Sequence, residues 1–188
     1  ELIRSFGPEV VSSADLVQQF EAVTDEAGYQ SHRETGEIIQ RIKDEAYGLM
    51  DQALKQSKPI TEYEVAQFIL TRFEEEGLTS DGHSPIVGFN DHPADPHFEP
   101  TAENAHTLSQ GDTILIDLWA RRVEPPGIYY DITWCGFAGE NPPALYQEIF
   151  GVVCRARDTA LEFVTRRIES GEPCRGCDVD QATRKVVE

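Results

Sequence analysis

The sequence predicts an α+β fold in which an antiparallel sheet, containing a β-hairpin with two aspartates, is flanked by helices. Three observations support this fold class. Apolar residues recur with helical spacing before residue 77 and after residue 141. Two β-branched runs between residues 114 and 134 are joined by the turn signal Pro125-Pro126-Gly127. The length of 188 residues is enough for one domain with a hydrophobic core, so we expect a single unit, 1–188.

The chain before the first strand is expected to be a helical lead-in, over about residues 12–77. A first helix is predicted to end at Gly28, because glycine is a common helix stop. A longer amphipathic helix is predicted for residues 34–56, with charged residues on its outer face. The third helix should open at Thr61–Glu64, which has the sequence of a capping box, and end at Gly77.

A turn-rich stretch, residues 80–110, separates these helices from the hairpin. It contains one short predicted strand, Pro85–Phe89, and four of the five histidines, His83, His92, His97 and His106. A long loop with this composition is typical of a functional segment. Histidines also serve as turn residues in solvated loops, so both interpretations stay open on the residues alone.

Two further helices are predicted after the hairpin. Asn141–Pro143 should start a long helix, whose apolar stripe continues to Gly171. A last helix is expected to begin near Asp178 or Asp180 and to run to the end of the chain.

Each strand of the predicted hairpin has an aspartate inside an apolar run. If the strands pair symmetrically about Glu124, the two acids face each other and the opposite face of the hairpin is a continuous apolar surface. The pairs that follow are Asp117 with Asp131, Leu115 with Thr133, and Trp119 with Tyr129.

Carboxylates placed opposite each other on a sheet, with Cβ atoms roughly 5 Å apart, repel unless something neutralises them. Three interpretations of Asp117 and Asp131 stay open at this point. They share a proton as an acid/base dyad, or they hold a divalent metal, or they are incidental acids at a wet sheet edge or in a slipped register.

Composition narrows the class of partner. The chain has 34 acidic and 16 basic residues, which gives a formal net charge of −18. Such a charge repels nucleic acids and anionic membranes, so neither is expected as a partner. No run of eighteen apolar residues and no charged leader before an apolar stretch occurs. We therefore expect neither a membrane span nor a secretory signal.

The cysteines do not predict a zinc site. Cys174 and Cys177 have the C-x-x-C spacing, but neither Cys135 nor Cys154 supplies the second pair that a zinc site needs. We expect all four to be reduced, in a cytoplasmic protein. Because the chain begins at Glu1 and not at a methionine, it is expected to be a processed or excised piece.

The order of motifs resembles that of the pita-bread metallopeptidases, which include methionine aminopeptidase, aminopeptidase P and prolidase. The motifs are PIVGFN, DPHFEP, GDTILIDLWA and YYDITWCGF, followed by a long helix and DVDQATRKVVE. The similarity is closest to the Xaa-Pro-specific branch. It implies that the chain is the N-terminal half of a pita-bread fold.

The resemblance also implies a dinuclear site of manganese, cobalt or zinc, built from aspartate, histidine and glutamate ligands. By position, Asp117 would chelate one metal ion, Asp131 would bridge both, and His97 would approach the substrate near the scissile bond. Trp119 stands where a small residue is common, and its bulk is expected to narrow the substrate pocket. The remaining histidine and glutamate ligands come later in the family, so this chain alone is expected to be inactive.

The implied function is that of a metal-dependent exopeptidase, an Xaa-Pro aminopeptidase or dipeptidase. A water activated by the two metal ions would hydrolyse the peptide bond next to proline. The complete protein would bind two divalent ions, and this fragment need bind none. Peptides are the expected substrates, and pairing with another chain, as in a homodimer, is one expected way to supply the missing half.

Two alternatives to this function stay open. One is a catalytically inactive pita-bread module that binds peptides or proteins, and the other is a metal-free hydrolase similar to creatinase. Both kinds of relative usually lack part of the metal-ligand set. The presence of both Asp117 and Asp131 therefore argues against them.

Overall fold

The structure is a computed structural model that describes residues 6, 7 and 9–188. The described residues form two compact units, which are divided in the chain between Ala138 and Gly139. That residues 1–188 fold as a single unit stays a prediction.

The first unit begins with three helices, α1 (Ala14–Glu21), α2 (Glu26–Lys55) and α3 (Glu62–Glu75). The predicted boundary at Gly28 is wrong, because this glycine lies in the first turn of α2. The side chain of the N-cap residue Asp25 accepts a hydrogen bond of 2.8 Å from the Gly28 amide. The stretch at residues 29–33 is mostly polar, so its helical turn has no apolar periodicity to detect.

The capping box at the start of α3 is confirmed. Thr61 Oγ1 accepts from the Glu64 amide at 3.2 Å, and the Glu64 carboxylate accepts from the Thr61 amide at 2.8 Å. This reciprocal pair satisfies backbone donors that a helix N-terminus leaves without partners. The helix ends just before Gly77, whose φ of 69° is the left-handed conformation that glycine adopts readily.

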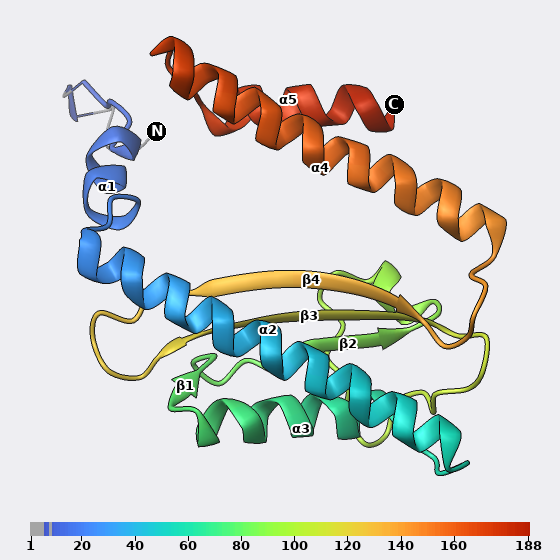
Figure 1. Cartoon of the computed structure of the whole chain (residues 1–188). Coiled ribbons are helices and arrows are strands. Elements are labelled where there is room, and N and C mark those ends of the chain that lie inside the picture. The colour runs from blue at the N-terminus through green and yellow to red at the C-terminus, as the bar shows by residue number, and fades with distance from the viewer. Residues whose placement is uncertain (1–5, 8) are drawn as a thin grey trace. The chain divides into compact units, whose positions relative to one another are not determined.

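A four-stranded antiparallel sheet follows, with β3 at its centre (Figure 1). Its strands are β1 (Leu78–Thr79), β2 (Ile86–Phe89), β3 (Thr113–Arg122) and β4 (Tyr130–Phe137). β3 pairs with β4, with β2 and with the short β1, which the sequence did not predict. The 3₁₀ helix η2 (His92–Ala94) lies in the loop between β2 and β3. These elements confirm the predicted α+β class and form an open sheet, as in part of a pita-bread fold.

One face of this sheet packs against α2 and α3, which form the core of the unit with it (Figure 1). Burial alternates along β3, and its buried residues are Ile114, Ile116, Leu118 and Ala120. These four belong to the face that the sequence predicted to be apolar. The aspartate of β3 lies on the other face, because successive side chains of a strand point in opposite directions.

The second unit consists of α4 (Ala144–Ser170) and α5 (Gly176–Val187), which pack against each other. The predicted end of the long helix is confirmed by Gly171, which caps α4 in the left-handed conformation with φ of 67°. The last helix begins at Gly176, two residues before Asp178, the earlier of its two predicted starts. None of the described helices has both the length and the apolar character needed to cross a membrane.

Candidate metal site on the hairpin

The hairpin has a different register from the predicted one. Asp117 pairs with Thr133, and Asp131 pairs with Trp119, so the prediction that the two acids are directly opposite is wrong by two residues. The loop at residues 123–129 is too long to impose symmetry about Glu124. Packing against α2 sets the register instead, as the contacts of β4 with that helix show.

Two close approaches fix β4 on α2. A Cβ atom on Gly36 of α2 would lie 2.5 Å from the ring of Tyr130, and one on Gly136 of β4 would lie 2.6 Å from the ring of Tyr47. The Tyr47 hydroxyl also donates a hydrogen bond of 3.0 Å to the carbonyl oxygen of Trp134. Tyr130 consequently lies opposite Ala120, and every other pair follows from that one.

Asp117 and Asp131 nevertheless share one face of the sheet, as predicted. They are diagonal neighbours on adjacent strands, a relation that leaves long side chains within reach of each other. Partial loss of solvent around the Asp131 carboxyl and the nearby charge of Asp117 raise the pKa of Asp131, although much of this residue is exposed. The site thus has an excess of negative charge that a cation would relieve.

Thr133 orients one of the two carboxylates. Its hydroxyl donates a hydrogen bond of 2.8 Å to Oδ1 of Asp117, the residue directly across from it. Hydrogen bonds of this kind hold the carboxylates of metal sites in position and leave their second oxygen available. In the predicted register Thr133 faces Leu115, so its contact with Asp117 is not expected from the sequence, although its place two residues after Asp131 puts it on the same face.

Trp119 lies beside the acids, on the same face and directly opposite Asp131. It is half-buried, and its ring lies 6.4 Å from the ring of His83, measured between centroids. His83 belongs to the turn before β2. Trp119 therefore puts an aromatic side chain on the face of the carboxylates, with the His83 ring near it.

An ion pair ties the end of β3 to the turn after β1. Arg121 donates two hydrogen bonds to the Asp81 carboxylate, at 3.0 and 2.8 Å, and the Tyr129 hydroxyl donates to the same group. These contacts, with that of Arg121 the larger, lower the pKa of Asp81. Both oxygens of the Asp81 carboxylate thus have hydrogen-bond partners within the hairpin and its neighbouring turn.

His97 is exposed on the loop between η2 and β3. Its backbone amide donates a hydrogen bond of 2.9 Å to the Asp95 carboxylate, which fixes the local turn. Its role near a scissile bond stays a prediction.

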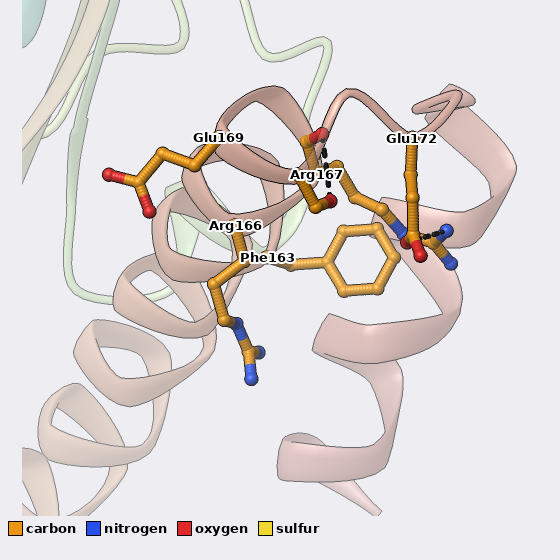
Figure 2. Close-up of a pocket in the computed structure, with 6 residues that line it drawn as sticks. Phe163, Arg166, Arg167, Glu169 and Glu172 are labelled. Carbon is orange, nitrogen blue, oxygen red and sulfur yellow. Dashed lines mark hydrogen bonds and ion pairs between the residues drawn. The ribbon is translucent and has the colours of Figure 1, made fainter.

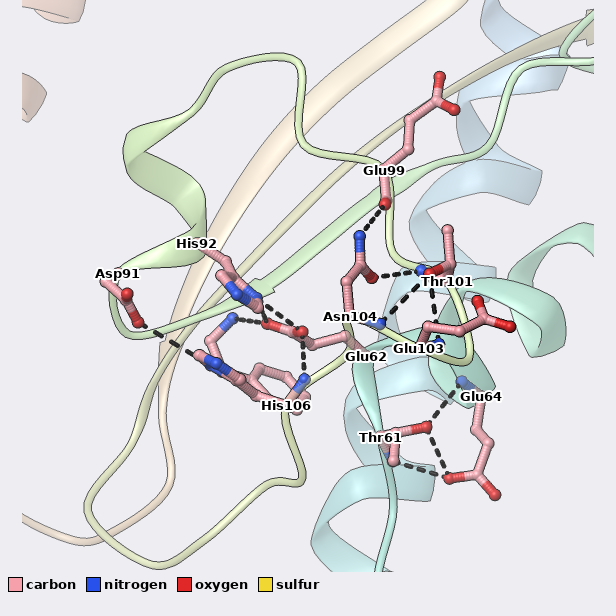
Figure 3. A network of polar contacts seen from close by, with 11 residues as sticks. Thr61, Glu62, Glu64, Asp91, His92, Glu99, Thr101, Glu103, Asn104 and His106 are labelled. Carbon is pink, nitrogen blue, oxygen red and sulfur yellow. Dashed lines mark hydrogen bonds and ion pairs between the residues drawn. The ribbon is translucent and has the colours of Figure 1, made fainter.

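A second cluster of titratable residues lies around Glu62, at the start of α3 (Figure 3). Potential ligand atoms of Glu62, His92 and His106 lie within 4.8 Å of one another. The two imidazoles, however, are stacked with centroids 3.7 Å apart and planes 20° from parallel. Their nitrogen lone pairs lie in these planes and do not converge on one point, so the cluster is arranged as a hydrogen-bond centre and not as a closed metal site.

A surface hollow in the second unit contains none of the predicted site residues (Figure 2). It lies at the end of α4, where Arg167 donates to Glu172 at 2.7 Å and lies over the ring of Phe163 at 5.2 Å. These contacts hold Glu172, just after the end of α4, against the last turns of the helix.

The hairpin pair fits the preference of divalent cations for carboxylate oxygen, but it supplies only part of a coordination sphere. Within the part of the chain that the structure describes, no third histidine, cysteine or acidic group joins Asp117 and Asp131 in a cluster of ligands. Further donors would have to come from other residues or from water.

Comparisons with known proteins agree with the fold. The model of metallopeptidase family M24 matches residues 30–188. The X-Pro aminopeptidase of Thermotoga maritima is 23% identical, with a TM-score of 0.68, over 92% of this chain and 44% of that chain. The dipeptidase PepE of Mycobacterium ulcerans is 25% identical, with a TM-score of 0.71, over 99% of this chain and 45% of that chain.

A third structure is the X-prolyl aminopeptidase of Caenorhabditis elegans, described as a cytosolic enzyme with a di-nuclear active site. It is 21% identical, with a TM-score of 0.67, over 77% of this chain and 23% of that chain. No curated protein sequence matches. The chain thus spans less than half the length of these three solved structures. Because the family model covers most of the sequence, the chain belongs to metallopeptidase family M24.

Proposed function

We propose that the protein containing this chain is a metal-dependent exopeptidase of the Xaa-Pro aminopeptidase or dipeptidase type. The observation that carries the proposal is the placement of Asp117 and Asp131 on one face of the hairpin, where partial loss of solvent and then the charge of Asp117 raise the pKa of Asp131. Membership of family M24, and the X-Pro aminopeptidase and dipeptidase among the similar structures, support the reaction class.

In this proposal Asp117 and Asp131 are ligands of two divalent ions, of manganese, cobalt or zinc. Bound between such carboxylates, the ions would lower the pKa of a water and polarise the scissile carbonyl. Thr133 keeps the Asp117 carboxylate turned toward the site through its 2.8 Å hydrogen bond. The di-nuclear site described for the C. elegans enzyme supports the number of ions.

Two further residues act on the substrate. His97 donates a hydrogen bond to the carbonyl oxygen of the scissile bond, where negative charge develops during attack. Trp119, with His83 beside it, limits the size of the residue that fits next to Asp131. A cytoplasmic location is part of the proposal and is supported by the cytosolic C. elegans enzyme.

The test is hydrolysis by the intact protein of matched peptides that differ only in proline or alanine at the second position. We expect activity that depends on Mn²⁺, Co²⁺ or Zn²⁺, favours the proline peptide and is lost in Asp131→Asn. Glu124→Gln, which removes an exposed carboxylate from the tip of the same hairpin, should leave the activity unchanged. Full activity in Asp131→Asn would refute the metal assignment, and metal-free peptide binding without hydrolysis would favour an inactive binding module.

A further inference from the structure

Glu62 is a fully buried carboxylate at the first position of α3. It accepts hydrogen bonds from three points of the chain that follows β2: the Phe89 amide at 2.5 Å, the His106 amide at 2.7 Å, and His92 Nδ1 at 2.8 Å. Figure 3 shows His92 and His106 converging on this one side chain. The Glu62 side chain therefore contacts both ends of the loop at residues 90–105 and its 3₁₀ helix. The later end is also held by a backbone hydrogen bond of 2.9 Å from the Leu108 amide to the Ile60 carbonyl.

A path of contacts leads from this carboxylate to His97. The His92 ring, which Glu62 holds, lies 4.1 Å from the ring of Phe98 and 3.7 Å from that of His106, measured between centroids. Phe98 is the residue next to His97 in the chain. The exposed His97 thus lies next in the chain to Phe98, whose ring packs on the imidazole that Glu62 holds.

Burial makes this arrangement sensitive to the chemistry of Glu62. A carboxylate offers only acceptors, and two of its partners are backbone amides that cannot turn away. A glutamine of the same size would present an amide group to one of these donors and leave a buried donor without a partner, which is costly.

We propose that Glu62 is a positioning residue that latches the loop at residues 90–105 and thereby sets the place of His97 relative to the hairpin acids. The part concerning His97 rests on the proposed function. The part concerning the loop rests on the hydrogen bonds alone.

Hydrogen exchange in the intact protein tests the latch without any assay of activity. In Glu62→Gln, amides at residues 95–104 should exchange at least about tenfold faster, because a strong buried hydrogen bond is lost. Glu64→Gln is the matched control, since it is on the same helix and glutamine also serves in a capping box. Unchanged exchange of the loop in Glu62→Gln would overturn the proposal.

A milder variant covers the case in which Glu62→Gln does not fold. His92→Ala removes the ring between Glu62 and Phe98 while both backbone hydrogen bonds to the carboxylate remain. It should also speed exchange at residues 95–104. Protection equal to that of the wild type would contradict the proposed path.

Kinetics test whether the latch acts through His97. We expect Glu62→Gln to lower kcat for a proline peptide by at least about tenfold, and to have little effect in a His97→Ala background. Equal losses in both backgrounds would show a general structural role and overturn the positioning of His97. If the wild type does not hydrolyse such peptides, the proposed function fails, while the exchange result still decides the latch.

Discussion

Asp131→Asn is expected to change the stability of the protein in opposite directions without and with a divalent metal. In the metal-free protein at neutral pH, the variant removes a charge that repels Asp117. In the metal-loaded protein, it removes a ligand. An incidental pair of surface acids would give the first effect, because the repulsion needs no metal, but not the second.

The magnitude follows from the register. Diagonal neighbours on adjacent strands lie about 7 Å apart. At that distance two unit charges in a water-like dielectric repel by about 0.6 kcal/mol, and salt reduces this value. The water-like value is appropriate because Asp131 is exposed. Metal at a hundred times its dissociation constant should stabilise the wild type by about 2.7 kcal/mol.

The pH dependence has a definite sign. Folding raises the pKa of Asp131, through loss of solvent and then through the charge of Asp117. The stability linked to this shift is fully present below the unfolded pKa and is lost as the pH rises through the folded pKa. The gain from Asp131→Asn in the metal-free protein should therefore be present at neutral pH and disappear in acid.

Urea unfolding of the intact protein, in EDTA and in excess Mn²⁺, measures these differences. Glu124→Gln is the control, because it removes an exposed carboxylate of the same hairpin away from Asp117. The account would be refuted if Mn²⁺ stabilised Asp131→Asn as much as it stabilises the wild type.

Four other substitutions have definite expected outcomes. Thr133→Val should weaken metal binding by about 10–100-fold, measured by calorimetry, because the ligand carboxylate loses its orienting hydrogen bond; unchanged affinity would contradict this role. Gly36→Ala should cost about 1–3 kcal/mol of unfolding free energy, because its Cβ would meet the ring of Tyr130 at 2.5 Å. Gly48 is on the same helix, and a Cβ atom added there would meet no other atom within 4 Å, so Gly48→Ala should instead raise the unfolding free energy by about 0.5–1 kcal/mol. Equal effects of the two substitutions would refute the packing of β4 on α2. Asp81→Asn should lower the unfolding free energy at neutral pH, because the lowered pKa of Asp81 contributes stability that is lost as the pH falls through the folded pKa. If the variant remained less stable than the wild type in strong acid, the Asp81–Arg121 ion pair would be excluded as the cause.

The faces of the hairpin could be predicted from the sequence, whereas its register could not. Alternation of side chains is a local property of any strand, so Asp117 and Asp131 were placed correctly on one face. The register depends on where Tyr130 packs on Gly36, which is 94 residues earlier in the chain and has no local signal in either strand. Symmetry about the turn was a poor substitute for this tertiary contact.

Helix boundaries show the same dependence on local signals. The capping box at Thr61 and the left-handed Gly171 were both predicted, because each satisfies the backbone of its own helix end. The sequence predicts a helix end at Gly28, which instead lies in the first turn of α2, where Asp25 caps its amide. A glycine can occupy either place, and the sequence of the next turn was too polar to decide between them.

The role of Glu62 lay beyond sequence reasoning. The capping box formed by Thr61 and Glu64, on either side of Glu62, explains why α3 starts at this point. No local sequence signal indicates that the Glu62 side chain is buried. Its partners Phe89, His92 and His106 lie 27 to 44 residues later in the chain. Only the folded loop brings these donors to one carboxylate.

The central claim, that Asp117 and Asp131 hold divalent metal together, is tested most directly by calorimetric titration of the intact protein and of Asp131→Asn with Mn²⁺ and Zn²⁺. The account predicts saturable binding by the wild type, and loss of at least one site or a large fall in affinity in the variant. The same stoichiometry and affinity in both proteins would contradict it.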